Sequence, residues 1–184
     1  GRLVPDDADL AKHRFAGNRA LAEQHAEQYH QLRLRGLREH PEAFTSSHDE
    51  EASKPLAWAR ARLAPSPAAP HNFVLGAFHE GALVGVVGVS VDMREKIRHK
   101  GRVFGMYVAP EHAARGIGRA LIEACIRKAR TLPGLEQLDL TVTEGNDRAK
   151  SLYEKAGFRT FGVAPKAIKL GDRYFDKCHM TLDL

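Results

Sequence analysis

Two stretches of this 184-residue chain combine residue types that could bind a phosphate and assist a group transfer. In the first, Gly116 and Gly118 alternate with Arg115 and Arg119, just before a segment with helical spacing. The N–H groups at a helix start are unpaired and lie at the positive end of the helix dipole, so they can bind a pyrophosphate. Glycine lets the anion approach without a Cβ clash, and arginine adds positive charge. A tight turn can have the same spacing, so this stretch alone does not establish a phosphate site.

The common nucleotide and metal motifs do not fit the sequence. A dinucleotide fingerprint requires a third glycine after Gly118, and a P-loop requires Gly-Lys-Ser/Thr; neither occurs. The ten histidines are scattered, and no HExxH, CxxC or Cys/His cluster has metal-ligand spacing. We therefore expect an anion site of another kind, and no metal.

The second stretch covers residues 146–158 and is predicted to form a short helix. A helix with one buried face explains its apolar residues, and Gly157 suits the cap just past its end. That reading does not explain Tyr153 followed two residues later by Lys155, at a helix end near the first stretch.

Together, residues 108–121 and 146–158 resemble the signature motifs of the GCN5-related N-acetyltransferases, the GNAT family. The resemblance extends from residue 72 to residue 184 and includes the order of the predicted strands. It implies an N-acetyltransferase that transfers the acetyl group of acetyl-CoA to a primary amine by direct attack. In this family the first motif holds the pyrophosphate, the asparagine of the second (here Asn146) contacts the pantetheine arm, and its tyrosine (here Tyr153) protonates the leaving thiolate. The acceptor would be a small-molecule or peptide amine, which the sequence does not name.

The resemblance also assigns the cofactor site. Ala113 departs from the family pattern, since the family usually has Gln or Arg there; one side-chain contact is lost, while the backbone amides that hold the phosphates remain. The residues expected to bind acetyl-CoA are Met106, Tyr107, Val108, Ala114, Arg115, Gly116, Ile117, Gly118, Arg119, Ala120, Asn146, Tyr153 and Lys155.

Thioester aminolysis requires a neutral amine near the carbonyl, donors for the developing oxyanion and an acid for the departing sulfur. A backbone N–H within residues 106–108 could polarise the carbonyl. The resemblance makes Tyr153 the expected catalytic residue, and a phenol with a pKa near 10 matches the basicity of a thiolate. The general base stays open among Asp92, Glu144 and His179, each of which could equally be an ordinary surface or core residue.

The elements that must position these residues form two regions. The N-terminal region, residues 1–70, has predicted helices at residues 18–36 and 54–63 and a Pro-rich connector at residues 64–70. Residues 71–184 alternate strands and helices, which predicts an α/β fold with a mixed, mostly antiparallel central sheet flanked by helices. The predicted strands are 72–78, 82–91, 102–109, 135–142, 158–163 and 174–182, and the predicted helices are 115–130 and 146–156.

The length is about right for one domain over residues 1–184. The resemblance implies that this is an N-acetyltransferase domain, with 1–70 on the acceptor side and 71–184 as the sheet and acetyl-CoA-binding core. With 43% hydrophobic residues the chain can build a core, and no apolar run approaches the roughly twenty residues of a membrane span. Two cysteines cannot make a disulfide framework, so we expect a cytoplasmic protein. A homodimer is compatible with the sequence.

The net charge of +5 favours anionic partners without choosing among them. The most basic segment, residues 94–102, is expected to be a solvated loop. It could alternatively recruit an acidic substrate or make the chain a nucleic-acid-binding module, but it lacks interleaved aromatic residues, so we do not expect nucleic acid as a partner. A non-catalytic acyl-CoA-binding sensor is the other alternative to an enzyme.

Overall fold

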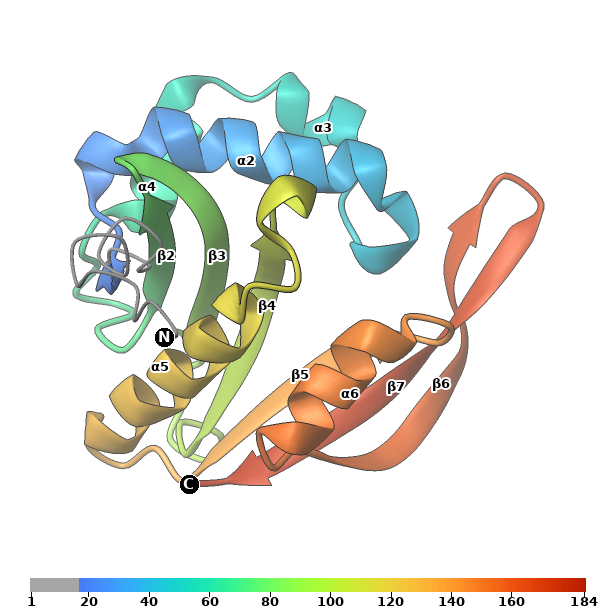
Figure 1. Ribbon diagram of the computed structural model, residues 1–184. Coiled ribbons are helices and arrows are strands. Elements are labelled where there is room, and N and C mark those ends of the chain that lie inside the picture. Colours follow the sequence, from blue (N-terminus) through green and yellow to red (C-terminus); the bar gives the residue numbers. More distant parts are fainter. Residues whose placement is uncertain (1–16) are drawn as a thin grey trace, which may run out of the picture.

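The computed structural model describes residues 17–184. Its centre is a seven-stranded sheet with the order β1-β2-β3-β4-β5-β7-β6, in which only the β4–β5 pair is parallel (Figure 1). The predicted fold class, a mixed and mostly antiparallel sheet flanked by helices, is confirmed. The strands are β1 (Asn18–Ala20), β2 (Phe73–His79), β3 (Ala82–Val91), β4 (Lys100–Val108), β5 (Gln137–Thr143), β6 (Arg159–Leu170) and β7 (Arg173–Asp183).

Helices cover both faces of the sheet, and each face has its own core. On one face, the amphipathic α5 turns Leu121, Ile122 and Cys125 onto the strands, and all three are fully buried. On the other face, Tyr29 and Leu32 of α2 pack against β2, β3 and β4. The helices are α2 (Ala26–Glu39), α3 (His48–Ala52), α4 (Leu56–Leu63), α5 (Ile117–Thr131) and α6 (Asp147–Lys155), with 3₁₀ turns at Glu23–His25, Pro41–Ala43 and Pro110–His112.

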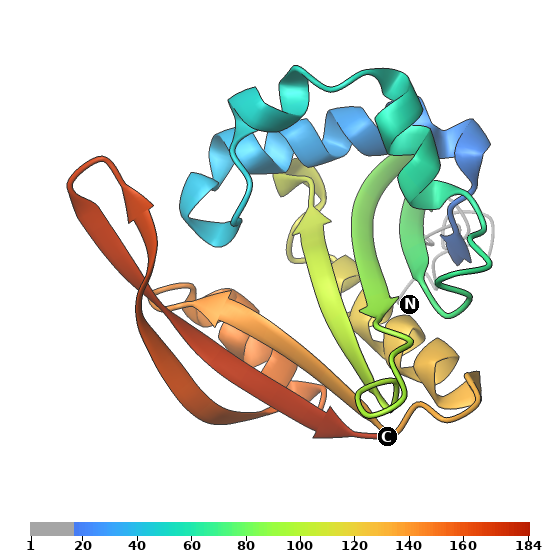
Figure 2. The ribbon, with the colours of Figure 1, turned by 180° about the vertical axis from the view of Figure 1, so that it is seen from behind.

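The sheet is split between β4 and β5. The two strands pair only from Lys100–Gln137 to Arg102–Asp139, and beyond this point they diverge, as Figures 1 and 2 show. The β3–β4 register shifts where β4 carries an extra residue, and Gly105 has a positive φ of +65° there. Such a bulge bends a strand. Beyond Arg102, β4 therefore keeps a partner strand on the β3 side and has none on the β5 side.

The N-terminal elements differ from the predicted helices. Residues 18–20 are not helical but form β1, which pairs with the edge of β2. The helix begins only at Ala26, after a 3₁₀ turn, and it runs to Glu39, where Pro41 follows. Helix α3 was not predicted from the sequence, although Ser47 and Glu50 form a capping box at its start.

The last two strands are longer than predicted and form a hairpin that extends beyond the sheet (Figure 1). Near its tip the register shifts around Lys166, whose backbone N–H is held by the Asp176 carboxylate at 2.8 Å. Residues of β6 are mostly exposed, so the alternation that marks a strand against a core is weak there. The extension to Leu170 was consequently not predicted.

Candidate active site

Two adjoining cavities open at the split between β4 and β5. The larger, of about 1260 Å³, extends from the start of α5 across α6 to the turn after α2. The smaller, of about 310 Å³, is lined by residues of α2, α4, β4, β5 and β7. The residues common to both are Ala43, Phe44, Met106, Thr143, Asn146, Ala149 and Leu152.

The start of α5 forms one wall of the large cavity. Gly116 caps the helix in the left-handed region, with a φ of +77°, and no side chain caps the first N–H groups. The first turn also has no acidic residue, so its positive dipole is unopposed. Ala114 shares the positive φ, at +62°, which curls the loop tightly ahead of the helix. This helix start can accept an anion on its backbone.

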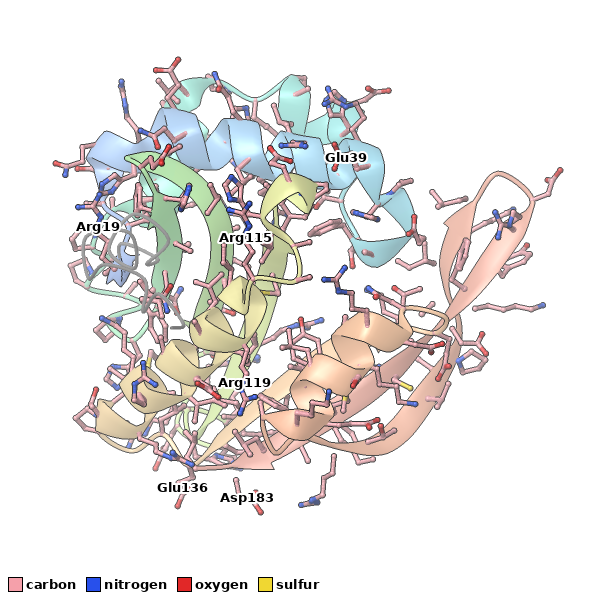
Figure 3. The ribbon with its side chains drawn as sticks, in the orientation of Figure 1. Arg19, Glu39, Arg115, Arg119, Glu136 and Asp183 are labelled. Atoms are coloured by element: carbon pink, nitrogen blue, oxygen red, sulfur yellow. The ribbon has the colours of Figure 1, made fainter. Side chains whose placement is uncertain are left out.

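The predicted residues of this loop do not all face the cavity. Ala114 and the segment Gly116–Arg119 line it, whereas Arg115 and Ala120 do not. Figure 3 shows the side chains of Arg115 and Arg119 well apart, one before α5 and the other in its first turn. The Arg119 Nε donates to Glu123 at 2.9 Å, one helical turn further along.

The start of α6 also lines the large cavity. The Asn146 Oδ1 accepts the backbone N–H of Ala149 at 3.3 Å and so caps α6, which leaves the amide nitrogen available to a ligand. Lys155 lines the same cavity, and so does Arg148, which was not predicted as a site residue. Their separation of seven residues places both cations on one helix face, a pattern that could have indicated Arg148.

Tyr153 lies on the small cavity and does not line the large one. Its side chain is buried, its ring packs at 6.0 Å from that of Phe158, and its hydroxyl makes no hydrogen bond to residues 17–184. Burial raises the pKa of the phenol, and the neighbouring Cys125 raises it further. The group therefore stays protonated across the neutral range and can act as a proton donor.

The three β4 residues predicted near the acetyl group all line the large cavity. The Tyr107 side chain turns toward α2, where its hydroxyl donates to the Glu39 carboxylate at 2.7 Å; Figure 3 places Glu39 at the end of α2. The N–H of Ala109 donates to Val84 of β3 at 2.8 Å. Because successive N–H groups alternate between strand edges, the N–H of Val108 points toward the open split.

The candidate general bases lie in different places. Asp92 is paired with Arg94 at 2.7 Å and lines neither cavity. His179 also lines neither and packs edge-on against Phe161. Glu144 lines the large cavity, where its carboxylate accepts the Cys178 thiol at 2.6 Å.

The basic segment 94–102 divides into residues with different surroundings. Arg94 is bound by Asp92, and Lys100 contacts Asp139 at 3.3 Å. Arg102 lines the small cavity. Lys96 and Arg98 are exposed and have no carboxylate within 4.0 Å among residues 17–184.

Comparison with known proteins identifies the family to which this chain belongs. The sequence model of the acetyltransferase (GNAT) family matches residues 21–158. The chain therefore belongs to the GNAT family, as its motifs predicted. Within residues 17–184, no helix is long and apolar enough to span a membrane, and no group of three or more His, Cys, Asp or Glu side chains could hold a metal ion.

Among curated relatives, the chain is 35% identical over 111 residues to mycothiol acetyltransferase of Propionibacterium freudenreichii subsp. shermanii, covering 60% of this chain and 35% of that protein. It is 34% identical over 107 residues to N-alpha-acetyltransferase RimI of Mycobacterium tuberculosis, covering 58% and 64%. These matches span less than two thirds of either relative. A protein from Salmonella typhimurium whose structure was solved with acetyl-CoA shares the fold with a TM-score of 0.73 at 21% identity, covering 91% of this chain and 92% of that one.

Proposed function

We propose that the protein is an acetyl-CoA-dependent N-acetyltransferase that acts on a primary amine. The observation that carries this proposal is the open edge of β4, which lies between an uncapped helix start and a buried, protonated tyrosine. A thioester placed along this edge would have a phosphate site at one end and an acid near the other. The family membership and the likeness to a structure solved with acetyl-CoA support the choice of donor.

The large cavity fits the donor in both charge and space. The unpaired N–H groups at the start of α5 are suited to the pyrophosphate, and Gly118 leaves room for it. Arg148 and Lys155 of α6 line the same cavity and add positive charge to it. The free amide nitrogen of Asn146 is placed to donate to the pantetheine arm.

The residues around the split supply the chemistry, and acetyl-CoA when bound supplies the activated acetyl thioester. The N–H of Val108 stabilises the oxyanion that forms when the amine nitrogen bonds to the carbonyl carbon. As the carbon–sulfur bond breaks, the Tyr153 hydroxyl gives its proton to the sulfur. The amine loses one proton, and Glu144 is the candidate acceptor that borders the large cavity.

The acceptor remains defined only as an amine. The two named relatives differ in what their names indicate, mycothiol in one and an α-amine in the other. The N-terminal region, through α2, α4 and the Phe44–Ser46 segment, forms one wall of the small cavity, which supports its proposed role on the acceptor side. A single domain, cytoplasmic location and assembly into a homodimer stay predictions.

Replacing Tyr153 with phenylalanine tests the role of the acid. Phenylalanine keeps the ring that packs on Phe158 and removes a hydroxyl that has no partner in the described structure, so folding should be preserved. General acid catalysis contributes about 10²–10⁴-fold, so kcat should decrease by a factor in that range while the Kd for acetyl-CoA stays unchanged. Thiol release and calorimetry measure the two quantities.

Tyr174→Phe is the matched control, because Tyr174 is exposed and lines neither cavity. Since the pKa of Tyr153 is raised, its proton is present at every pH below about 10, and the kcat/KM profile should rise with amine deprotonation without a falling limb in that range. An unchanged kcat in Tyr153→Phe would remove the acid role. Acetyl-CoA binding without thiol release for any amine would indicate a sensor.

A further inference from the structure

The small cavity has a strongly cationic wall. Four basic side chains line it, and no Asp, Glu or His does so among residues 17–184. They come from separate parts of the chain and converge only through the fold. The four are Arg33 of α2, Arg62 of α4, Arg102 of β4 and Lys177 of β7.

Two of these cations share one carboxylate within the protein. Arg33 makes a buried double hydrogen bond to the Glu51 carboxylate, at 2.6 and 2.8 Å. Arg62 lies 3.9 Å from the same carboxylate and stacks over the Trp58 ring at 4.7 Å. This pair therefore forms the fixed wall of the cavity.

The other two cations have no such partner. Neither Arg102 nor Lys177 has a carboxylate within 4.0 Å among the described residues. Asp139, which stands opposite Arg102 in the β4–β5 pairing, contacts Lys100 and Gln137 instead. The Lys177 Nζ donates only to the hydroxyl of Thr45, at 3.2 Å.

Arg102 and Lys177 also act on each other. The pKa of Lys177 is lowered, first by partial burial and then by the positive charge of Arg102. Two like charges facing one cavity without an anion between them repel, and a bound anion relieves that repulsion. Their side chains therefore form a site that is complementary to a negative group.

This unneutralised pair shares the small cavity with the proposed acid. Tyr153 and Met106 line the same space, and Met106 borders the large cavity too. Phe44 and Phe104 supply apolar surface. A volume of 310 Å³ corresponds to about ten water molecules, which is room for a small acceptor of similar heavy-atom count.

We propose that the acceptor is a small primary amine that carries a carboxylate, and that Arg102 and Lys177 bind the carboxylate. The assignment rests on the proposed N-acetyltransferase function. Binding the anion at this pair positions the amine in the cavity that holds Tyr153. The same charges repel polyamines, which have no negative group to offer.

Matched acceptors test the proposal. The probes are the free amino acids, their carboxamides, spermidine and short peptides, each assayed by thiol release with acetyl-CoA. The best free amino acid should exceed its own carboxamide in kcat/KM by about tenfold or more, since charge-assisted hydrogen bonds contribute that much. Spermidine and the peptides should be poor acceptors.

Variants assign the preference to the two cations. Arg102→Gln and Lys177→Met should each raise the KM for the free amino acid about tenfold or more, with the carboxamide changed less than twofold. Arg102→Lys should restore part of the loss, because the charge returns. Lys96→Ala is the matched control, since Lys96 lies in the same basic segment but lines neither cavity.

A binding measurement separates this proposal from the proposed function. The protein saturated with CoA is titrated with N-acetyl amino acids and with their amides, in the wild type and in both variants. If no acceptor is turned over but the acids bind through Arg102 and Lys177, the function fails and the ligand class stands. Equal turnover of acids and amides, a preference for spermidine or peptides, or binding of the acids unaffected by both variants overturns the assignment.

Discussion

Substitutions at Gly118 should change acetyl-CoA binding without destabilising the fold. A Cβ there would lie 3.4 Å from the nearest atom, a methyl carbon of Leu152, which is an ordinary contact. An aspartate at this point in the first turn of α5 would interact favourably with the helix dipole. Gly118→Asp should therefore fold with unchanged or higher stability and lose at least about tenfold in acetyl-CoA affinity, because a carboxylate occupies the anion site.

Calorimetric titration and thermal unfolding measure these two effects. Gly118→Ala is the matched control, since it adds the Cβ without the charge, and it should bind acetyl-CoA more tightly than Gly118→Asp. Wild-type affinity in the aspartate variant would place the pyrophosphate elsewhere.

Local sequence signals located part of the candidate site. Gly116 and Gly118 could be placed on the cavity because a helix start and its glycines are recognisable from neighbouring residues. Arg115 and Ala120 were predicted to bind the cofactor as well, but neither residue lines the cavity. Which side of a loop or helix a residue faces depends on its position in the turn, and these two face elsewhere. Lys177 could not have been found this way, because its place depends on the pairing of β7 with β5, which joins residues far apart in the chain.

At the scale of elements, the contact between α2 and β4 depends on the absence of a side chain at Gly36. The Tyr107 ring lies against this glycine, and a Cβ would approach its Cγ at 3.0 Å. The ring is buried, and Glu39 holds its hydroxyl, so it has little room to move. Overpacking in Gly36→Ala should lower the free energy of unfolding by about 1–3 kcal/mol. The higher helix propensity of alanine should offset at most about 1 kcal/mol of this loss.

Urea unfolding measures the free energy of unfolding for this variant. Gly162→Ala is a suitable control, because a Cβ at Gly162 meets no atom within 4 Å, and its stability should stay near that of the wild type. If Gly36→Ala unfolds at the wild-type urea concentration, the α2–β4 contact is more adaptable than its geometry indicates.

Elements buried against the sheet were predicted more accurately than those at its margins. The segments of β2, β3 and α5 have clear apolar periods because one or both of their faces are buried. The residues of β1 form a strand only because the edge of β2 is available to pair with them. The outer part of the β6–β7 hairpin is a two-stranded ribbon with exposed faces, so it has no core-facing alternation to detect.

At the scale of the whole molecule, the net charge of +5 is spread over residues with different surroundings. Lys96 and Arg98 are exposed and unpaired among residues 17–184, so they should behave as a solvated surface. The double variant Lys96→Ala/Arg98→Ala should leave acetyl-CoA affinity and the turnover of a neutral amine within about twofold, because exposed charges are screened by salt. Calorimetry and thiol release check both values.

The same variant tests the nucleic-acid alternative. Wild-type protein should show no tight binding to RNA or DNA at physiological salt. Tight binding that weakens steeply with salt in the wild type, and with a shallower slope in the double variant, would contradict this expectation.

The split between β4 and β5 also has a consequence for the stability of the sheet. An unpaired strand edge normally risks association with other chains, but here it faces inward, between walls that include α5 and α6. The backbone of β4 gives up cross-strand partners along this length, so the joint between the two halves of the sheet is weaker than its neighbours. A mutation that extended the pairing of β4 with β5 would make the sheet more stable. It would also close the space in which donor and acceptor meet. At this joint, a gain in stability therefore comes with a loss of activity.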